Sequence, residues 1–427
     1  MVLSRKLRPF AWDHTMPSPE NAPIPGRLED KMASTHPSPK KALFVYDFRL
    51  YRQGTNVRVR HFPYSLWEQR YLPVFSEIEI LGREAITQAE NLDSLPVSSG
   101  PGLTFTSLPN LSSLANQLIK RRYVQRILAT KISTADLTII RLPSELGYLA
   151  AQQAKRLGRP YVIEAVGCPF DALWNYGSLK AKLWAPIAKQ RMRLALRQAP
   201  FVIYVTERFL QARYPTNGSA IACSNVTLDA TASTPPAHVG VPLSNKPKIT
   251  LGLIGYLGTD YKGADTAIQA IAQLQRPNVV LELVGGGDHS RLKQLASNLR
   301  VQNQIRFLGQ LPHEAVKDWL STLDLYLQPS RTEGLPRALL EAMSLGLPAI
   351  GSTAGGIPEL LPLSDLHPPS DSRRLAALIK RAILDDAWRL EASKRNLVTA
   401  QKYLFSNLNN RRLTFLKAAM QGAQFNY

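Results

Sequence analysis

The stretch Arg331-Thr-Glu-Gly-Leu-Pro-Arg-Ala-Leu-Leu-Glu-Ala-Met343 decides which fold this chain can adopt. A short apolar strand, residues 325–327, is predicted to run into it and to end before Pro329. Pro336 suits the first turn of a helix, where its missing backbone N–H costs nothing, so a helix should follow at once. The free N–H groups at the start of that helix, together with its positive dipole end, form an anion site.

Two glutamates, Glu333 and Glu341, bracket the turn from this loop into the helix. Carboxylates repel a bare phosphate, so their position beside an anion site indicates a different ligand. A phosphate with hydroxyl groups on both sides would use both features, because carboxylates accept hydrogen bonds from hydroxyls. The stretch therefore predicts a site for a sugar nucleotide.

The chain has 427 residues, enough for two or three domains of roughly 100–200 residues each. Its two cysteines, Cys168 and Cys223, are too few for a disulfide framework and suit a reducing compartment. No apolar run approaches the roughly 20 residues that cross a bilayer as a helix. Residues 1–40 are rich in Pro, Ser and charge, and we expect a disordered arm there.

The net charge of +20 predicts a polyanionic partner: a nucleic acid, an anionic membrane or an acidic saccharide. Acidic residues are missing between Asp93 and Asp136 and again between Asp171 and Glu207, where Lys and Arg alternate with apolar residues. Helices of this kind suit the surface of an anionic bilayer. The same pattern of residues equally suits solvated helices that pack on a sheet with their basic faces outward.

Short apolar strands alternate with helical stretches, which predicts parallel sheets flanked by helices. The predicted strands are residues 42–46, 78–81, 103–106, 137–140, 161–165, 201–205 and 219–223, and then 249–254, 279–284, 305–308, 325–327 and 348–351. Residues 225–246, rich in Thr, Ala, Ser and Pro, have the composition of a linker. We therefore expect two α/β domains, residues 41–224 and 247–385, followed by helices in residues 386–427.

Two glycine-containing loops follow strands of the second domain. Residues 254–263 end in Lys262-Gly263, which offers a point charge to phosphate but lacks the ending of a Walker A loop. Residues 285–288 read Gly-Gly-Gly-Asp. Either loop alone could be only a turn between a strand and a helix. Because ligands bind at the carboxyl ends of parallel strands, three suitable loops at one edge predict a binding site.

Over residues 249–361 this sequence resembles the donor half of the family 4 retaining glycosyltransferases, the group 1 glycosyl transferases. The motifs that carry the resemblance are Lys262-Gly263, residues 283–288, residues 305–309, Pro329-Ser330, the pair Glu333 and Glu341, and Gly355-Gly356-Ile357-Pro358-Glu359. The resemblance implies the α/β GT-B fold. This fold has two facing Rossmann-like domains with parallel sheets, and a C-terminal helix that crosses back to the first domain.

The resemblance also implies roles for single residues. Glu333 would contact the transferred sugar, and Lys262 would neutralise the leaving diphosphate, so these two form the implied catalytic pair. Glu341 would accept hydrogen bonds from the ribose, and the backbone N–H groups of Arg337 and Ala338 would bind the phosphates. The other implied donor contacts are Gly258, Gly286, Leu335 and Leu308, the last in the segment that would touch the base.

Three positions depart from the family pattern. Tyr256 stands where an arginine is usual, which removes one positive charge near the phosphates unless Arg331 or Arg337 replaces it. Pro336 has no N–H to offer the donor sugar. Val166 stands where many members carry a histidine on the acceptor side.

The acceptor side offers Arg141, Glu164 and Asp171, which lie at or after the ends of predicted strands. Each could equally serve only the structure. Asp47 and residues 48–55, expected as a loop after the first strand, form another edge that could contact the acceptor.

The resemblance implies transfer of a sugar, with retention, from a UDP- or GDP-sugar to a hydroxyl of a saccharide or lipid-linked acceptor, in cell-envelope or exopolysaccharide synthesis. We expect no required metal, no resident cofactor and no specific nucleic acid. We also expect a cytoplasmic enzyme, peripheral on the membrane if the basic helices bind lipid. A sugar-nucleotide epimerase on the same fold and a basic nucleic-acid-binding protein are the alternatives.

Overall fold

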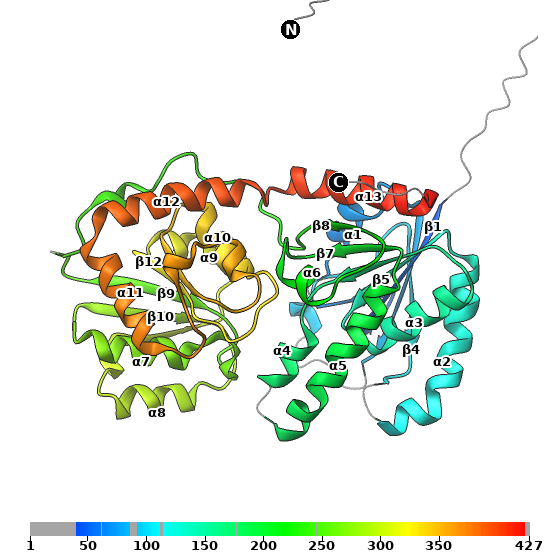
Figure 1. The fold of residues 1–427 in the computed structure, drawn as a ribbon, viewed down its shortest axis with the longest axis horizontal. Helices are drawn as coiled ribbons and strands as arrows, with labels where there is room; N and C mark the ends of the chain where they lie inside the picture. Colours follow the sequence, from blue (N-terminus) through cyan, green and yellow to red (C-terminus); the bar gives the residue numbers. More distant parts are fainter. Residues whose placement is uncertain are drawn as a thin grey trace, which may run out of the picture. The chain divides into compact units, whose positions relative to one another are not determined.

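The structure, a computed structural model, describes residues 40–422 apart from 61, 86–91, 112–113, 176–177 and 245. All but the last residue of the predicted arm, residues 1–40, lies outside this range. The described chain builds two α/β halves, each around one sheet whose neighbouring main strands run parallel (Figure 1). This arrangement confirms the predicted fold class.

The first half is built on a sheet with the order β4-β3-β1-β5-β6-β7-β8, and β2 pairs antiparallel with β1. Its strands are β1 (Lys41–Gln53), β2 (Asn56–Arg58), β3 (Glu77–Glu84), β4 (Leu103–Leu108), β5 (Leu137–Leu142), β6 (Tyr161–Ala165), β7 (Phe201–Tyr204) and β8 (Ser219–Ala222). Its helices are α1 (Tyr64–Arg70), α2 (Leu114–Thr134), α3 (Glu145–Arg156), α4 (Pro169–Trp174), α5 (Leu179–Arg197) and α6 (Phe209–Arg213).

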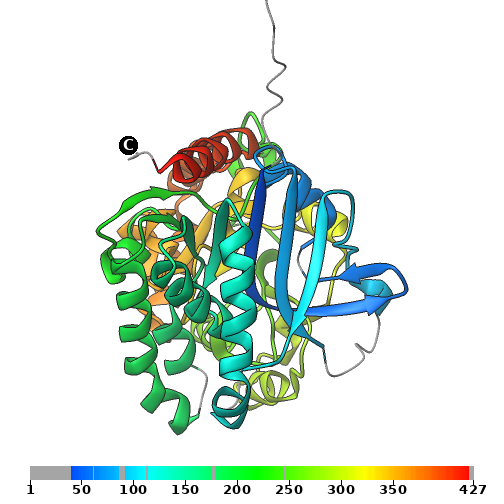
Figure 2. The same ribbon diagram turned by 90° about the vertical axis from the view of Figure 1, so that its right-hand side faces the viewer.

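Alternating residues of β1 fill two cores, one on each face of this sheet, because successive side chains of a strand point to opposite faces. Leu43 and Val45 belong to the core that includes residues of α2, α3 and α5. Phe44 belongs to the other core, in edge contact with Trp67 of α1 at 4.9 Å between ring centroids. Figure 2 shows the blue strands beside the green and teal helices.

The second half is built on a parallel sheet with the order β11-β10-β9-β12-β13-β14. Its strands are β9 (Ile249–Ile254), β10 (Val279–Val284), β11 (Ile305–Gly309), β12 (Leu325–Gln328), β13 (Ala349–Ser352) and β14 (Leu366–His367). Its helices are α7 (Ala264–Leu274), α8 (Ser290–Asn298), α9 (His313–Ser321), α10 (Arg337–Ser344) and α11 (Ser372–Leu384), and α12 (Asp386–Gln401) packs against α10.

The last helix, α13 (Phe405–Gln421), packs on the first half rather than the second. Phe415 contacts Phe201 of β7, with ring centroids 5.8 Å apart. The fully buried Arg412 donates to the backbone carbonyl of Ser224 at 3.0 Å. The chain therefore returns to the first half, as the fold class predicts.

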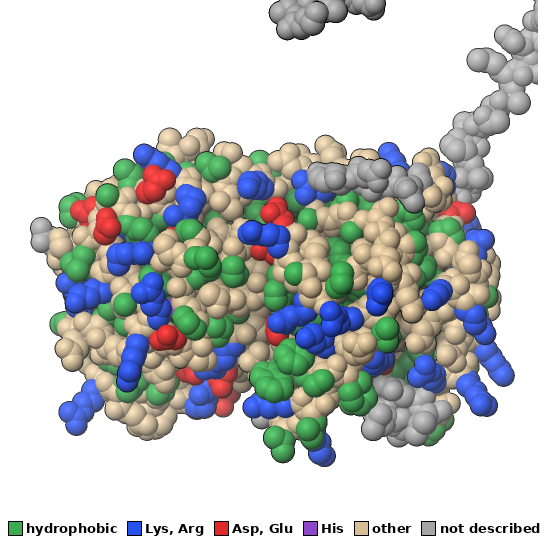
Figure 3. Space-filling model, viewed as in Figure 1, with side chains coloured by type: hydrophobic (Ala, Val, Ile, Leu, Met, Phe, Trp, Pro, Cys, Tyr) green, Lys and Arg blue, Asp and Glu red, His purple; other side chains and the backbone are tan. Residues whose placement is uncertain are grey.

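The charge of the chain is visible on its surface. In the face shown in Figure 3, Lys and Arg side chains are spread across both halves, and Asp and Glu are fewer. Of the residues that the structure describes, no helix is long and apolar enough to cross a membrane.

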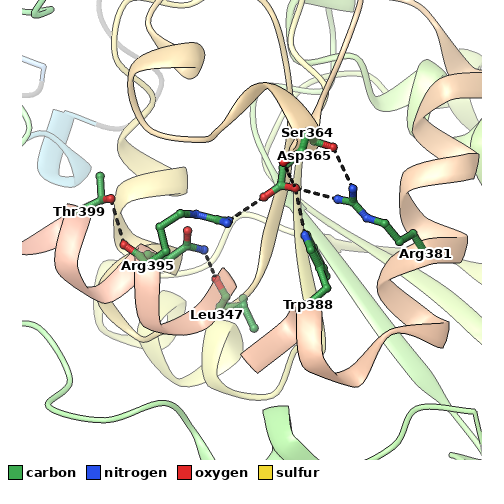
Figure 4. A network of polar contacts seen from close by, with 8 residues as sticks. Leu347, Ser364, Asp365, Arg381, Trp388, Arg395 and Thr399 are labelled. Atoms are coloured by element: carbon green, nitrogen blue, oxygen red, sulfur yellow. Dashed lines mark hydrogen bonds and ion pairs between the residues drawn. The ribbon is translucent and has the colours of Figure 1, made fainter. Parts of the chain in front are cut away.

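A buried carboxylate, Asp365, ties the last helices to the second sheet (Figure 4). It accepts hydrogen bonds from Arg381 of α11 at 2.7 Å and from Trp388 of α12 at 3.0 Å. Arg395, about two α12 turns beyond Trp388, donates to the other carboxylate oxygen at 2.7 Å. Two cations therefore face one carboxylate, so its buried charge is compensated.

One expectation about the first half is wrong. Residues 48–55 do not form a loop, because β1 continues to Gln53 and turns at Gly54, which has a φ of +58°, into β2. Phe48 and Leu50 are buried on this extension, while Arg49 between them is exposed. Burial of alternate side chains stabilises the longer strand.

Candidate functional site

The cationic side of the site is Lys262, at the end of the 3-10 turn Asp260–Lys262 that follows β9. Its aliphatic stem lies across Gly255, where a Cβ atom would be only 2.3 Å from Lys262 Cγ. A glycine at position 255 is therefore what lets the stem cross the backbone. The ammonium group ends 2.6 Å from Glu333 Oε1.

The carboxylate of Glu333 is held through one of its oxygens. Oε1 accepts from Lys262 at 2.6 Å, from the Ser330 hydroxyl at 2.8 Å and from the Gln328 amide at 3.0 Å. Gln328 is fixed in turn by the hydroxyl of Tyr326, 3.0 Å from its Oε1. Among the described residues no hydrogen bond reaches Glu333 Oε2, so this oxygen can accept from a ligand hydroxyl.

The loop that carries Glu333 is anchored on both sides. Arg331 donates to Asp265 at 2.6 Å, to the Asp260 carbonyl at 3.0 Å and to Ser370 at 2.8 Å. A Cβ atom at Gly355, which has a φ of +56°, would lie 2.1 Å from the Glu333 carbonyl oxygen. Arg331 is thus committed to the loop and is not the cation that compensates for Tyr256.

The start of α10 keeps the features of the predicted anion site. Pro336 occupies the position before Arg337, and no side chain caps the first turn. The N–H groups of Arg337 and Ala338 are among the first four of this helix, which have no partner within the helix. The Arg337 side chain is exposed and makes no ion pair within the described part of the chain, so it is available to a phosphate.

Glu341, on the same helix, is half-buried. Burial first, and then the charges of Glu333 and Glu341, raise the pKa of the buried Tyr326 hydroxyl. Both glutamates therefore lie near one residue of β12. Leu335, between the two, packs partly buried against the core.

The glycine loops predicted to approach the donor lie together. Leu257 N donates to Gly286 O at 2.8 Å, which joins the loop after β9 to the loop after β10. The Tyr256 ring lies beside Gly258, 2.9 Å from where a Cβ atom of that residue would stand. Tyr256 is 57% exposed, so an aromatic face occupies the place of the usual cation.

The segment predicted to touch a base has an aromatic neighbour that the sequence did not indicate. Leu308 is 38% exposed, and Phe307 before it stacks on His289 with ring centroids 4.7 Å apart. Lys293 lies over the same Phe307 ring at 5.7 Å. No motif marked His289 or Lys293, because their proximity to Phe307 arises only from the packing of α8 beside β11.

The acceptor-side candidates are held in ion pairs. Arg141 Nε lies 3.4 Å from Glu164 Oε2, and the Tyr71 hydroxyl donates to Glu164 Oε1 at 2.8 Å. Glu164 is only 1% exposed, so it does not reach a substrate and instead holds Arg141. Asp171 pairs with Arg213 at 2.6 Å. It makes no ion pair with Arg141 in the described structure.

Glu359 joins the two halves beside the site. Its carboxylate accepts from three consecutive backbone N–H groups at the start of α6, those of Glu207 at 2.6 Å, Arg208 at 2.9 Å and Phe209 at 2.6 Å. On the other side of the site, the Tyr261 hydroxyl donates to the Ala172 carbonyl at 3.2 Å. The loops around Glu333 and Lys262 therefore contact the first half through these hydrogen bonds.

No group of three or more His, Cys, Asp or Glu residues within the described ranges could hold a metal ion. The charged and dipolar groups of the site are two glutamates, Lys262, Arg337 and a helix N-terminus. Such a set can hold hydroxyls and stabilise negative charge on a phosphate.

Comparison with known proteins identifies relatives of this chain. A family model described as "Glycosyl transferases group 1" matches residues 240–399. Protein CapJ of Staphylococcus aureus is 33% identical over 370 residues, which cover 86% of this chain and 92% of CapJ. AmsK of Erwinia amylovora, an amylovoran biosynthesis glycosyltransferase, is 35% identical over 135 residues, 29% of this chain and 33% of AmsK.

Among solved structures, HepE of Anabaena in complex with UDP and glucose superposes with a TM-score of 0.61 at 20% identity. The superposition covers 89% of this chain and all of HepE. At this identity the likeness concerns the fold, which is GT-B.

Proposed function

Because this chain belongs to the group 1 glycosyl transferases and is a glycosyltransferase, we propose that it transfers a sugar from a nucleotide diphosphate to an acceptor hydroxyl with retention. The observation that carries the proposal is the contact of 2.6 Å between Lys262 and Glu333 at the start of an uncapped helix. This contact places a carboxylate that can accept hydrogen bonds from sugar hydroxyls beside a cation that can bind phosphate.

In this proposal the donor lies along the carboxyl ends of the second sheet. The diphosphate is bound by Lys262, the Arg337 side chain and the first N–H groups of α10. The free oxygen of Glu333 accepts from hydroxyls of the transferred sugar, and Glu341 accepts from the ribose. The base lies near Leu308. HepE, which shares the fold, was solved with UDP and glucose, which supports this class of donor.

Catalysis rests on the leaving group. As the bond between the anomeric carbon and the diphosphate oxygen breaks, negative charge grows on that oxygen, and Lys262, Arg337 and the helix dipole stabilise it. The acceptor oxygen forms its bond to the anomeric carbon on the same face. Its proton passes to the departing phosphate, which conserves charge and configuration without a protein base at Val166.

The acceptor is a saccharide or a lipid-linked saccharide, bound by the first half. Of the three acceptor-side candidates, Arg141 and Glu164 are buried and paired with each other, and Asp171 is partly exposed. AmsK acts in amylovoran biosynthesis, which supports a role of this chain in polysaccharide synthesis. The two free, buried thiols suit a reducing compartment, and we propose a cytoplasmic location.

The first experiment is a thermal-shift panel of UDP- and GDP-sugars with the full chain. The donor should raise Tm as its concentration rises, because a ligand that binds the native state stabilises it. Free glucose and free phosphate serve as controls. No shift with any nucleotide sugar would contradict the donor site.

The second experiment follows the anomeric proton of the product by NMR with the donor so identified. Transfer with retention supports the proposal. Release of the free epimerised sugar in the presence of acceptors would instead show the epimerase alternative, and an inverted product would refute the stereochemistry.

A further inference from the structure

Helix α5 carries a second apolar face that its own fold does not use. Its inward face is buried through Ala185, Ala188, Met192 and Leu196. The apolar residues at the start of α5 point elsewhere: Leu179, Leu183 and Ile187 are 76%, 73% and 46% exposed. Their spacing of four residues places them along one stripe of the helix.

Two tryptophans extend this stripe. Trp184 of α5 is 43% exposed, and Trp174 at the end of α4 is 47% exposed. We call Trp174, Leu179, Leu183, Trp184 and Ile187 the apolar surface. Figure 3 shows hydrophobic side chains gathered over α4 and the start of α5, with Lys and Arg beside them. Five large apolar side chains in one exposed group mark a site of interaction.

The charges around the apolar surface indicate what it meets. No acidic residue occurs between Asp171 and Glu207, whereas Lys180, Lys182 and Arg193 of α5 are exposed and make no ion pair in the described chain. Lys182 instead lies over the Trp174 ring at 6.0 Å. Cations beside Trp and Leu suit the boundary between anionic headgroups and acyl chains.

A cavity of about 810 Å³ beside this helix is also basic. Its lining includes Lys189 and Arg193 from α5 and Arg208 and Arg213 from α6 or its start. It also includes the carboxylate of Glu359, which accepts from three backbone N–H groups. Only Arg213 of the four cations pairs with a carboxylate in the described structure, that of Asp171. The cavity can therefore take the phosphate of a headgroup next to the apolar surface.

A second helix presents the same combination. On α2, Ile119 and Tyr123 are 76% and 58% exposed, and Lys120, Arg121 and Arg122 between them are exposed as well. In Figure 1 the starts of α2 and α5 lie at the same end of the first half, away from α13, and Figure 2 agrees. Both helices can thus meet one flat surface.

We propose that the apolar surface inserts into the headgroup region of an anionic bilayer, with the cations of α5 and α2 on its phosphates. The apolar surface adjoins the proposed donor site. The side-chain amide of Asn175, next to Trp174, lies 3.5 Å from the backbone carbonyl of Arg331, in the loop that carries Glu333. An acceptor whose reacting saccharide is attached to a lipid would then reach the site from the membrane. Binding to the bilayer itself does not depend on the proposed sugar transfer.

The test is flotation of the full chain with vesicles of phosphatidylcholine alone and with 30% phosphatidylglycerol. Wild type should float with the anionic vesicles, less at high salt, and its Trp emission should shift to shorter wavelength. The double variant Leu183→Glu/Ile187→Glu should lose at least tenfold in vesicle affinity. Val398→Glu, which places the same charge at an exposed apolar position of α12, should bind as wild type.

Two variants with reversed charges complete the test. Lys180→Glu/Lys182→Glu should weaken binding to anionic vesicles, and Lys380→Glu/Lys394→Glu, at exposed lysines of α11 and α12, should weaken it far less. Circular dichroism and Tm check that each variant folds. Equal binding by Leu183→Glu/Ile187→Glu and wild type would overturn the proposal. So would a wild type that ignores vesicles but forms dimers that the same double variant dissociates.

Discussion

At the scale of single residues, the proposed donor site depends on the position of the Lys262 ammonium group. The side-chain stem reaches that position by crossing Gly255. In the proposed complex the Lys262 ammonium donates a hydrogen bond to the charged diphosphate, and a charged hydrogen bond contributes roughly 1.5–3 kcal/mol. Lys262→Met should therefore weaken the affinity for the nucleotide sugar by roughly 10- to 100-fold, measured by isothermal titration calorimetry. Gly255→Ala should cause a similar loss although the charge remains, because the new methyl group would displace the Lys262 stem.

Gly240→Ala is the matched control for that pair, since a Cβ at Gly240 meets no atom within 4 Å and its backbone is not in the left-handed region. Its donor affinity should equal that of wild type. If Gly255→Ala also bound the donor as wild type does, the position of Lys262 would not matter for binding.

At the scale of elements, the strands were predictable and their ends less so. The second-half strands β9 and β10 begin and end where the sequence predicts, because each is an apolar run between turn residues. The extension of β1 was missed although Phe48 and Leu50 alternate with polar residues, since Asp47 interrupts the apolar run. The commitment of Arg331 to Asp265 could not be predicted, because it depends on a contact 66 residues away.

The network around Asp365 holds α11 and α12 on the second sheet. Asp365→Ala would leave Arg381 and Arg395 without their buried partner, and breaking a buried pair costs about 3–5 kcal/mol. We expect a loss of this size in the free energy of urea unfolding of the second half. An exposed control, Asp318→Ala on α9, whose carboxylate makes no ion pair among the described residues, should lose much less. An unchanged midpoint in Asp365→Ala would contradict the role of the network.

His367 of β14 gives the second half an acid-sensitive element. Burial first lowers the pKa of this imidazole below its ordinary 6.5, against smaller opposing effects from its bond to Pro368 O and from Asp371. Below pH 6.5 the unfolded chain therefore binds the proton more readily than the native chain, so stability falls as pH decreases. The slope is at most about 1.4 kcal/mol per pH unit.

His367→Asn keeps a donor toward Pro368 O and removes the titrating ring. Urea unfolding at pH 7 and pH 5.5 should show a smaller loss of stability on acidification in this variant than in wild type. An identical loss in the two proteins would exclude His367 as its source.

At the scale of the whole molecule, Glu359 links the second half to the first through three backbone N–H groups of residues 207–209. Glu359→Gln puts an NH₂ group against these donors and removes the charge. We expect kcat to fall several-fold while donor affinity stays near wild type, because the donor residues all lie in the second half. A larger radius of gyration by X-ray scattering should accompany the change.

Glu391→Gln is the control, since Glu391 is exposed on α12 and makes no hydrogen bond or ion pair among the described residues. It should leave kcat and the radius of gyration unchanged. A Glu359→Gln enzyme with normal kcat would show that the link between the halves does not position the site.

The central claim is that Glu333 acts on the transferred sugar, and not on the nucleotide. It is tested most directly by measuring transfer rate and donor affinity together in Glu333→Gln. The amide keeps one acceptor but loses the charge that pairs with Lys262. We predict that turnover falls by roughly 100-fold or more, about 2.7 kcal/mol in the barrier, while affinity for the free nucleotide diphosphate changes less than fivefold. Near-wild-type transfer by Glu333→Gln would contradict the claim.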